Sequence, residues 1–165
     1  MDFRDVVHST NNRKIWICLA PARTTFTHSA PVTEFPSNTI DFQAYLLGMM
    51  NSSLINWLGH QVVNLHLTYE IFKSLPLPIF NPKNPIHSEI CEISGKIAIS
   101  GGFDYGAWEK RFSPPMEFDK DVQYKLEALC MIAFELGLKD ISFLKSFYNT
   151  DEINRIKLYL GELNE

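Results

Sequence analysis

The first eighty residues carry short apolar runs separated by polar stretches. The run Ile-Trp-Ile-Cys-Leu at 15–19 is β-branched and aromatic, is apolar on both faces and is ended by Pro21, so it predicts a short central strand. Residues 22–38 are rich in Thr, Ser and Pro and predict loops and short strands. Polar and apolar residues nearly alternate from 63 to 68, which predicts a short half-buried strand or an extended loop.

A helix is predicted in the middle of this half, where Asp41 can cap its start. Its apolar positions recur every three or four residues: Phe42, Tyr45, Leu46 and Met49. The polar residues 51–53 interrupt or recap the helix, and Gly59 is the expected stop of its continuation.

Prolines mark the boundary between the two halves of the chain. A short helix is predicted over 69–74, and Pro76 and Pro78 then favour an extended chain. Residues 81–85, with two further prolines, form the predicted Pro-rich linker.

Residues 86–165 show helical periodicity. One apolar stripe consists of Ile86, Ile90, Ile93 and Ile97, and a second consists of Val122, Leu126, Leu129, Cys130 and Ala133. Asn149 can cap a last helix, with Glu152 three residues on completing a capping box. These patterns predict an α+β fold in which residues 1–80 form a small mixed sheet with a helix and residues 86–165 form an all-helical support.

Composition limits the size and setting of the protein. With 165 residues, of which 45% are hydrophobic, the chain can bury one sizeable core and fits one domain or two small halves, not a multi-domain enzyme. It has no stretch of about 18 apolar residues and no secretory signal, so a cytoplasmic protein without membrane contact is expected. The three cysteines, Cys18, Cys91 and Cys130, have aliphatic neighbours and predict small buried hydrophobes in a reducing compartment.

Charge is distributed unevenly along the chain. The net charge is -4, but residues 1–80 hold five basic and five acidic residues, so the acidic excess lies downstream. If the chain has a nucleic-acid surface, this distribution therefore assigns it to the first half. Because a domain that binds DNA alone usually has a basic patch, most of the affinity would have to come from another domain.

Cofactor and catalytic motifs are missing from the sequence. The only adjacent glycine pair, at 101–102, follows a predicted helix and is expected to end it, which leaves no Gly-rich loop for a nucleotide or S-adenosylmethionine. The Asn-Pro pairs at 81–82 and 84–85 lack the second proline and the aromatic residue of the motif that holds an extruded adenine. We therefore expect no cofactor and no catalytic activity in this chain alone.

Two other groups of polar residues have the residue types of metal ligands. Asp119, Asp121 and Lys125 have the residue types of a nuclease site, but they lie opposite an apolar helical stripe, which favours a solvated face. His60 and His66 have no Cys or His partner at metal-ligand spacing, so no zinc site is expected. A Ser-His-Asp or Cys-His set stays open, although nothing marks a nucleophile.

Polar residues suited to DNA contact gather in the first seventy positions. The candidates are Arg4, Ser9, Thr10, Asn11, Asn12, Arg13, Arg23, Thr24, Thr25, His28, Asn64, His66 and Thr68. Arg can grip guanine and Asn can grip adenine through two hydrogen bonds, and the other types bond base edges or phosphates. The alternative is ordinary turn chemistry, in which Ser, Thr and Asn satisfy their own backbone. Arg13 and Arg23 flank the predicted strand, and we expect them to project from its ends toward one partner.

Five short motifs follow one another in a fixed order. They are Arg-Asp-Val at 4–6, Ser-Thr-Asn-Asn-Arg at 9–13, Leu-Leu-Gly-Met-Met-Asn-Ser at 46–52, His-Leu-Thr at 66–68 and Leu-Pro-Leu-Pro at 75–78. In this order they resemble the C-terminal target-recognition region of type II, single-chain restriction-modification adenine methyltransferases and their phage-exclusion relatives. The chain departs from that pattern at 15–17, where Ile-Trp-Ile replaces the family's Thr-rich start of the strand.

The resemblance implies a division of labour. An upstream domain of the same parent chain would bind S-adenosylmethionine and methylate the N6 of adenine, with or without endonuclease activity, while this region would select the sequence of double-stranded DNA. A rival interpretation is a protein-interaction or dimerisation module without DNA contact, because the acidic helical half and the neutral first half suit it equally well.

Overall fold

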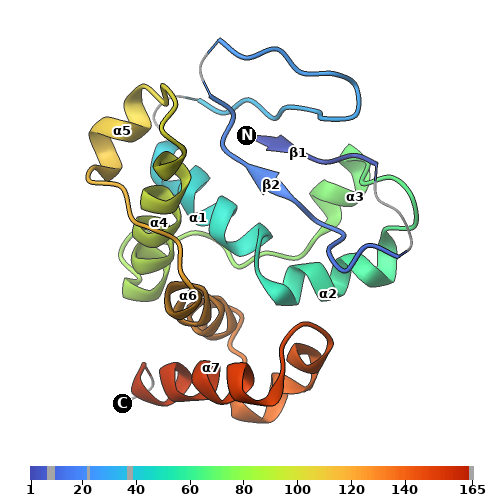
Figure 1. The fold of residues 1–165 in the computed structure, drawn as a ribbon, viewed down its shortest axis with the longest axis vertical. Coiled ribbons are helices and arrows are strands. Elements are labelled where there is room, and N and C mark those ends of the chain that lie inside the picture. The colour runs from blue at the N-terminus through green and yellow to red at the C-terminus, as the bar shows by residue number, and fades with distance from the viewer. Residues whose placement is uncertain (7–9, 22, 37–38, 164–165) are drawn as a thin grey trace.

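Helices make up most of the fold, and the extended segments gather at the end of the long axis that holds the N-terminus (Figure 1). The computed structural model describes residues 1–6, 10–21, 23–36 and 39–163. Within these ranges no helix has both the length and the apolar character needed to cross a bilayer.

Within its described residues, the first half contains three α-helices. Helix α1 (Ile40–Met50) is followed at once by α2 (Ser53–Val62), because the Ser52 side chain accepts a hydrogen bond from the Ile55 N–H and starts a new helix. Two sequence expectations here are wrong. The residue before α1 is Thr39 rather than Asp41. Gly59 does not stop α2, because it lies inside the helix with the Ile15 side chain packed against it.

The segment after α2 is extended and then forms one short helix. His66 pairs with Val6 in an isolated bridge, which agrees with the predicted extended conformation of 63–68. Helix α3 (Tyr69–Ser74) confirms the predicted short helix, and the Thr68 hydroxyl caps it by accepting from the Ile71 N–H.

The predicted helical second half is confirmed. It consists of α4 (Pro85–Ala98), the 3-10 turn η2 (Ile99–Gly101), α5 (Ala107–Phe112), α6 (Lys120–Ala133), the 3-10 segment η3 (Leu138–Ser146) and α7 (Thr150–Glu162). Asn149 and Glu152 form the predicted capping box at the start of α7. Gly102, with φ of 72°, ends η2, as expected of the glycine pair.

The predicted small mixed sheet is wrong. In the described residues the sheet is a two-residue antiparallel ladder of β1 (Asp2–Phe3) and β2 (Ile17–Cys18), with Phe3 opposite Ile17. The run 15–19 is also not a central strand, because residues 1–5 lie between it and the loop 29–33 and bond to both.

Residues 1–5 have a second neighbour in the loop 29–33. On this side Phe3 N–H donates to Pro31 O at 3.2 Å and Asp5 N–H donates to Ser29 O at 3.1 Å. The N-terminal segment is therefore held from both sides.

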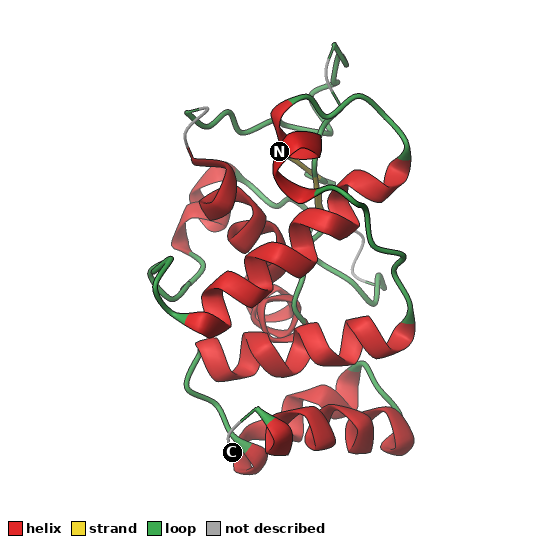
Figure 2. Ribbon diagram, turned by 90° about the vertical axis from the view of Figure 1, so that its left-hand side faces the viewer, coloured by secondary structure: helices red, strands yellow, loops and turns green. Residues whose placement is uncertain are grey.

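Two hydrophobic cores hold the helices together. The larger one joins α1 to α4 and contains buried residues from Met1 to Cys130, so it spans the Pro-rich segment 81–85. The smaller one joins α6, η3 and α7, which lie together near the C-terminus (Figure 2). Helix α6 contributes to both cores, since Leu129 belongs to the first and Ala128 to the second.

Candidate functional site

Three predicted DNA-contacting side chains are exposed on segments that meet around Asp5: Arg4, His28 and His66. The Asp5 N–H donates to Ser29 O at 3.1 Å, and the Asp5 carbonyl accepts from the Leu67 N–H at 2.8 Å. The His66 imidazole Nδ1 lies 3.3 Å from both carboxylate oxygens of Asp5. Backbone pairing thus brings Asp5 and His66 into contact, although they are 61 positions apart in sequence.

The other members of the predicted set are placed differently. Asn64 and Thr68 are exposed on the segment that carries His66, and the Thr68 hydroxyl is used as the cap of α3. Arg23 lies in a loop with the exposed Thr24 and Thr25, and its Nη2 is 3.3 Å from the Asp104 carboxylate. Thr10 and Asn12 are exposed, Asn11 is half-buried, and Ser9 lies outside the described residues.

Arg13 does not project toward a partner as expected, because its side chain is committed inside the protein. The Nε–H donates to Ile15 O at 3.1 Å, and Nη2 donates to Asn51 O. The guanidinium also lies over the Trp16 ring, 5.3 Å from its centroid. Burial lowers the pKa of Arg13, while the nearby Glu127 carboxylate opposes that shift.

Two asparagines that the sequence did not single out hold the backbone around Arg13. Asn51 Nδ2 donates to Ile17 O, in β2, at 2.8 Å. Asn56 Oδ1 accepts from the Lys14 N–H at 2.6 Å, and its Nδ2 donates to Asn12 O at 3.1 Å. These amides supply the hydrogen bonds that a neighbouring strand would otherwise give.

The ladder has one buried face and one outward face. Phe3 and Ile17 point into the core, whereas Arg4, Trp16 and Cys18 are exposed, Trp16 by 51%. The sequence interpretation, in which this run is apolar and buried on both faces, did not anticipate that Trp16 is exposed. It is also wrong for Cys18, which is exposed rather than buried. The available signal was the two-residue alternation Ile-Trp-Ile-Cys, which a half-buried ladder requires.

Arg4 and Trp16 share a shallow hollow. Its volume is about 170 Å³, and Ser29 and Ala30 form its far side. Arg4 makes no side-chain hydrogen bond or ion pair within the described ranges, so its guanidinium is available to a partner. A planar aromatic ring next to a guanidinium suits contact with nucleic acid bases and phosphates.

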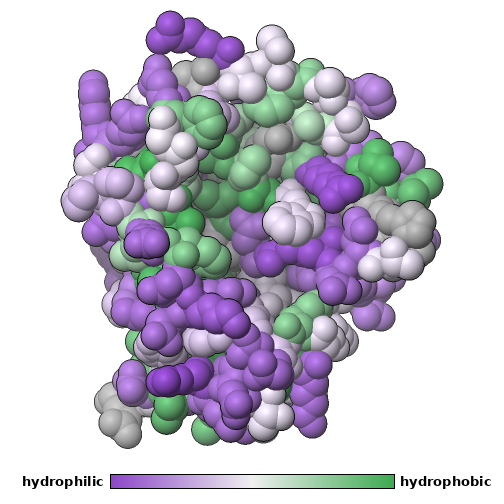
Figure 3. Space-filling view, in the orientation of Figure 1, coloured by the Kyte–Doolittle hydropathy of each residue, from purple (hydrophilic) through white to green (hydrophobic). Residues whose placement is uncertain are grey.

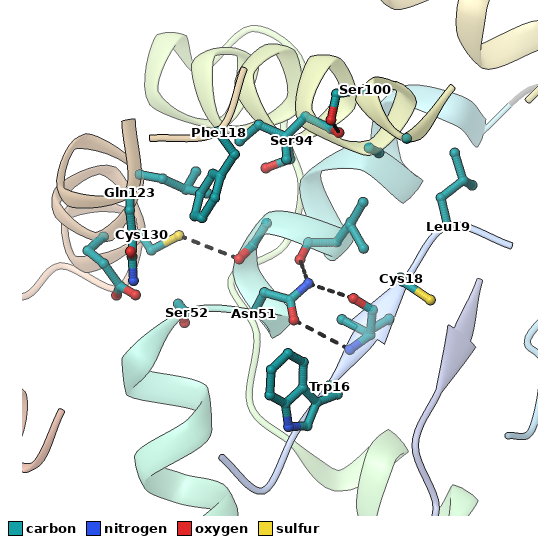
Figure 4. Close-up of a pocket in the computed structure, with 18 of the residues that line it drawn as sticks. Trp16, Cys18, Leu19, Asn51, Ser52, Ser94, Ser100, Phe118, Gln123 and Cys130 are labelled. Carbon is teal, nitrogen blue, oxygen red and sulfur yellow. Dashed lines mark hydrogen bonds between the residues drawn. The ribbon is translucent and has the colours of Figure 1, made fainter. Parts of the chain in front are cut away.

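A larger cavity lies on the other side of Trp16, between β2, α1, α4 and α6 (Figure 4). Its volume is about 480 Å³. The space-filling view shows apolar surface gathered in a hollow over the upper half of the molecule, whereas the lower half is mainly hydrophilic (Figure 3). The cavity walls include Leu19, Leu47, Phe118 and Leu126, together with the polar Arg13, Ser94 and Glu127.

Glu127 is a buried carboxylate at the floor of this region. Its oxygens accept from the Ser53 N–H at 3.0 Å, from the Ser53 hydroxyl at 2.8 Å and from the Tyr148 hydroxyl at 3.0 Å. Burial raises the pKa of Glu127, and the hydrogen bonds from Ser53 and Tyr148 oppose the rise. The carboxylate also lies at the N-terminal end of α2, where the helix dipole favours negative charge.

The residues weighed for metal binding serve other purposes. The Asp119 side chain accepts from the Val122 N–H at 2.8 Å and caps α6, and Lys125 Nζ lies 2.6 Å from Glu89. His60 Nε2 is 3.1 Å from Asn12 O. In the described part of the chain, no three His, Cys, Asp or Glu side chains are grouped as metal ligands.

Comparisons with known proteins give this chain no relative. No family model matches the sequence, no curated protein matches it, and no solved structure matches the fold.

Proposed function

We propose that the chain is a sequence-specific DNA-recognition module of an adenine N6 methyltransferase. In this proposal a methyltransferase domain of the same parent chain binds S-adenosylmethionine and carries out the chemistry. The ordered motifs from 4–6 to 75–78 support the enzyme class. One structural observation carries the DNA-binding part: Arg4, Trp16, His28 and His66 are all exposed, on segments that backbone hydrogen bonds join at residues 1–5. We call these four side chains the reader surface.

The reader surface has the chemistry of base and phosphate contact. Arg4 can bond phosphate oxygens or the edge of guanine, and His28 and His66 can bond base edges or phosphates. The exposed Trp16 ring can stack on a sugar or an unstacked base. The surface stands on the ladder and its backbone bonds, which place its side chains on one supported framework.

Charge limits what this surface achieves by itself. Residues 1–80 have no net basic charge, and Arg23 is already paired with Asp104. Asp5 lies beside His66 and weakens the attraction for phosphate. The module should therefore bind DNA weakly alone, with a sequence preference that is detectable at low salt, and hold its site at ordinary salt when its catalytic partner grips the duplex.

Selection from a random duplex pool tests the proposal. The 165-residue chain is used at about 50 mM salt, and bound duplexes are sequenced over successive rounds. We expect one sequence to be enriched and to bind more tightly than a scrambled duplex. Absence of enrichment, together with equal binding to both duplexes, would overturn the proposal.

Matched charge variants locate the contact. Arg4→Gln should weaken binding to the enriched duplex and reduce its salt dependence by about one unit of slope. Lys139→Gln removes the same charge from the exposed surface of η3 and should leave both quantities unchanged. Equal effects from the two variants would indicate general charge attraction and would contradict a reader surface.

A second candidate function is a protein-interaction module. Four large apolar side chains are exposed on segments that border the reader surface: Val6, Val62, Leu65 and Tyr69, each by 40–52%. Exposed apolar side chains of this kind are typical of protein contacts when they form a continuous patch. Sedimentation of the chain, with and without Leu65→Ser, tests this function. A concentration-dependent dimer that Leu65→Ser abolishes would support the protein-interaction function. If the duplex selection also enriches no sequence, this function is favoured over DNA recognition.

A further inference from the structure

The cavity beside Trp16 has the size of a small-molecule site. Its volume of about 480 Å³ falls within the range of roughly 300 to 1,000 Å³ that is usual for ligand pockets. Four elements that are far apart in sequence enclose it, and its walls are mainly apolar (Figure 4). An occupant would therefore bury part of its apolar surface against these walls.

The charged and amide groups of the cavity already have partners. Arg13 donates to two backbone carbonyls, Asn51 bonds the carbonyl of Ile17, and Glu127 accepts from Ser53 and Tyr148. One cation and one anion line the cavity, so their charges balance. These features favour an uncharged occupant, because an ion would lose its hydration without meeting a free counter-charge.

The hydroxyl of Ser94, unlike the charged and amide groups of the cavity, has no hydrogen-bond partner among the described residues. The residue is only 4% exposed. It lies on the α4 wall of the cavity, facing the part of α1 that contains Gly48 (Figure 4). The Ser94 oxygen has less than 1 Å² of accessible surface, so it turns toward the cavity only by rotation of the side chain. A buried hydroxyl without a partner is unfavourable, so an occupant that bonds the rotated hydroxyl would gain stability.

Gly48 makes room for this hydroxyl. A Cβ atom at position 48 would lie 2.2 Å from Ser94 Oγ, which is far closer than atoms can approach. The smallest residue on α1 thus stands opposite the hydroxyl on α4. Trp16 adds a flat ring at the edge of the cavity, on which an aromatic molecule can stack.

We infer that this cavity is a binding site for a flat, uncharged and mainly apolar small molecule with one hydrogen-bonding group, which pairs with Ser94. The site is separate from the reader surface, although Trp16 borders both. Its existence does not depend on DNA recognition.

Three probes of equal ring size test the inference on the 165-residue chain. Quinoline offers one acceptor for the Ser94 hydroxyl, naphthalene has the same shape without it, and 2-naphthoate carries a charge. Titrations followed by amide and indole N–H chemical shifts should place the changes at Trp16 and Ser94. We expect quinoline to bind about fivefold more tightly than naphthalene, and 2-naphthoate to bind most weakly.

Variants on α4 separate a specific site from general stickiness. Ser94→Ala should make quinoline bind no better than naphthalene, whereas Ser88→Ala, an exposed serine on the same helix outside the cavity, should keep the preference. Ala98→Met places a longer side chain into the cavity and should weaken both neutral probes about tenfold or more. Thermal unfolding of each variant checks that it is folded.

The inference would be overturned by any of three results. These are no binding of any probe, an equal quinoline preference in Ser94→Ala and the unchanged protein, or tightest binding by 2-naphthoate. Failure of the duplex selection would leave the probe results as they stand, so the two proposals are tested separately.

Discussion

Single polar side chains in the first half stabilise β2 and the backbone before it, on the side that faces no other strand. Asn51 and Asn56 bond the chain from Asn12 to Ile17, and Arg13 turns inward to bond Ile15 O and Asn51 O. Residue type alone does not distinguish these roles from DNA contact. The sequence could predict that Asn and Arg bond something, but only the burial of each side chain decides whether the partner is the protein.

Removing the Asn56 amide should therefore destabilise the fold. In Asn56→Ala the Lys14 N–H loses its acceptor in a buried position, and we expect a loss of about 1–3 kcal/mol in the free energy of unfolding. Urea unfolding measures the change. Asn64→Ala, at an exposed position of the predicted site, should shift it by less than about 0.5 kcal/mol, and equal losses would contradict this account.

Glu127 should give a pH dependence of unusual sign for a carboxylate. Because burial raises its pKa in the folded state, the folded protein binds this proton more tightly than the unfolded chain does. The contribution to stability is then complete below the unfolded pKa of about 4.3 and is lost as the pH rises through the higher folded value. Acidification from about pH 7 to pH 5 should thus stabilise the protein relative to Glu127→Gln, which cannot titrate there.

The opposite sign is expected at Glu152. Hydrogen bonds from the Asn149 backbone and from Lys120 lower the pKa of Glu152, so its contribution is present at neutral pH and is lost in acid. Comparing the unfolding of Glu152→Gln and Glu127→Gln from about pH 7 to about pH 3 separates the two groups, because the Glu152 contribution is lost only below the unfolded pKa of about 4.3. A parallel pH trend in the two variants would contradict the assignment.

At the scale of elements, the most extensive contact among the described residues lies between α1 and α4. Gly48 is the point of approach, because a Cβ there would meet Ser94 Oγ at 2.2 Å and Ile90 Cγ2 at 2.9 Å. Alanine normally favours a helix over glycine by about 1 kcal/mol. At this position we expect overpacking to prevail, with Gly48→Ala destabilising by about 1–3 kcal/mol.

Gly161 in α7 is the matched control. A Cβ at this helical position meets nothing within 4 Å, so Gly161→Ala should stabilise the protein by up to about 1 kcal/mol. Opposite shifts in the melting temperature are therefore expected from the same substitution in two helices. Two shifts of the same sign would show that packing at Gly48 does not decide the outcome.

Elements governed by local chemistry could be predicted from the sequence, and those governed by distant partners could not. The Asn149 cap, the Pro-rich entry to α4 and the short α3 each depend on residues within a few positions. The ladder depends on residues 1–5 reaching 16–18 and 29–33. Apolar alternation does not encode that pairing, so the predicted sheet and the central place of 15–19 were wrong.

At the scale of the whole molecule, the two halves are not expected to fold independently. The larger core takes residues from α1 and from α4, α5 and α6, and the α1–α4 contact is the most extensive in the fold. A fragment of residues 1–84 should therefore lack a cooperative thermal transition. Circular dichroism and dispersed amide signals measure this, and a cooperative transition in the fragment would contradict it.

The carboxylate of Glu127 ties the start of α2 to α6 and, through Tyr148, to the segment before α7. The start of α2 in the first half thus depends on a side chain from the second half. A chimera that receives only the first half would leave the Ser53 N–H without its acceptor, unless the host provides an acidic side chain at the same place. Engineers who transplant this module should move the whole unit through α7, or build the replacement carboxylate into the recipient.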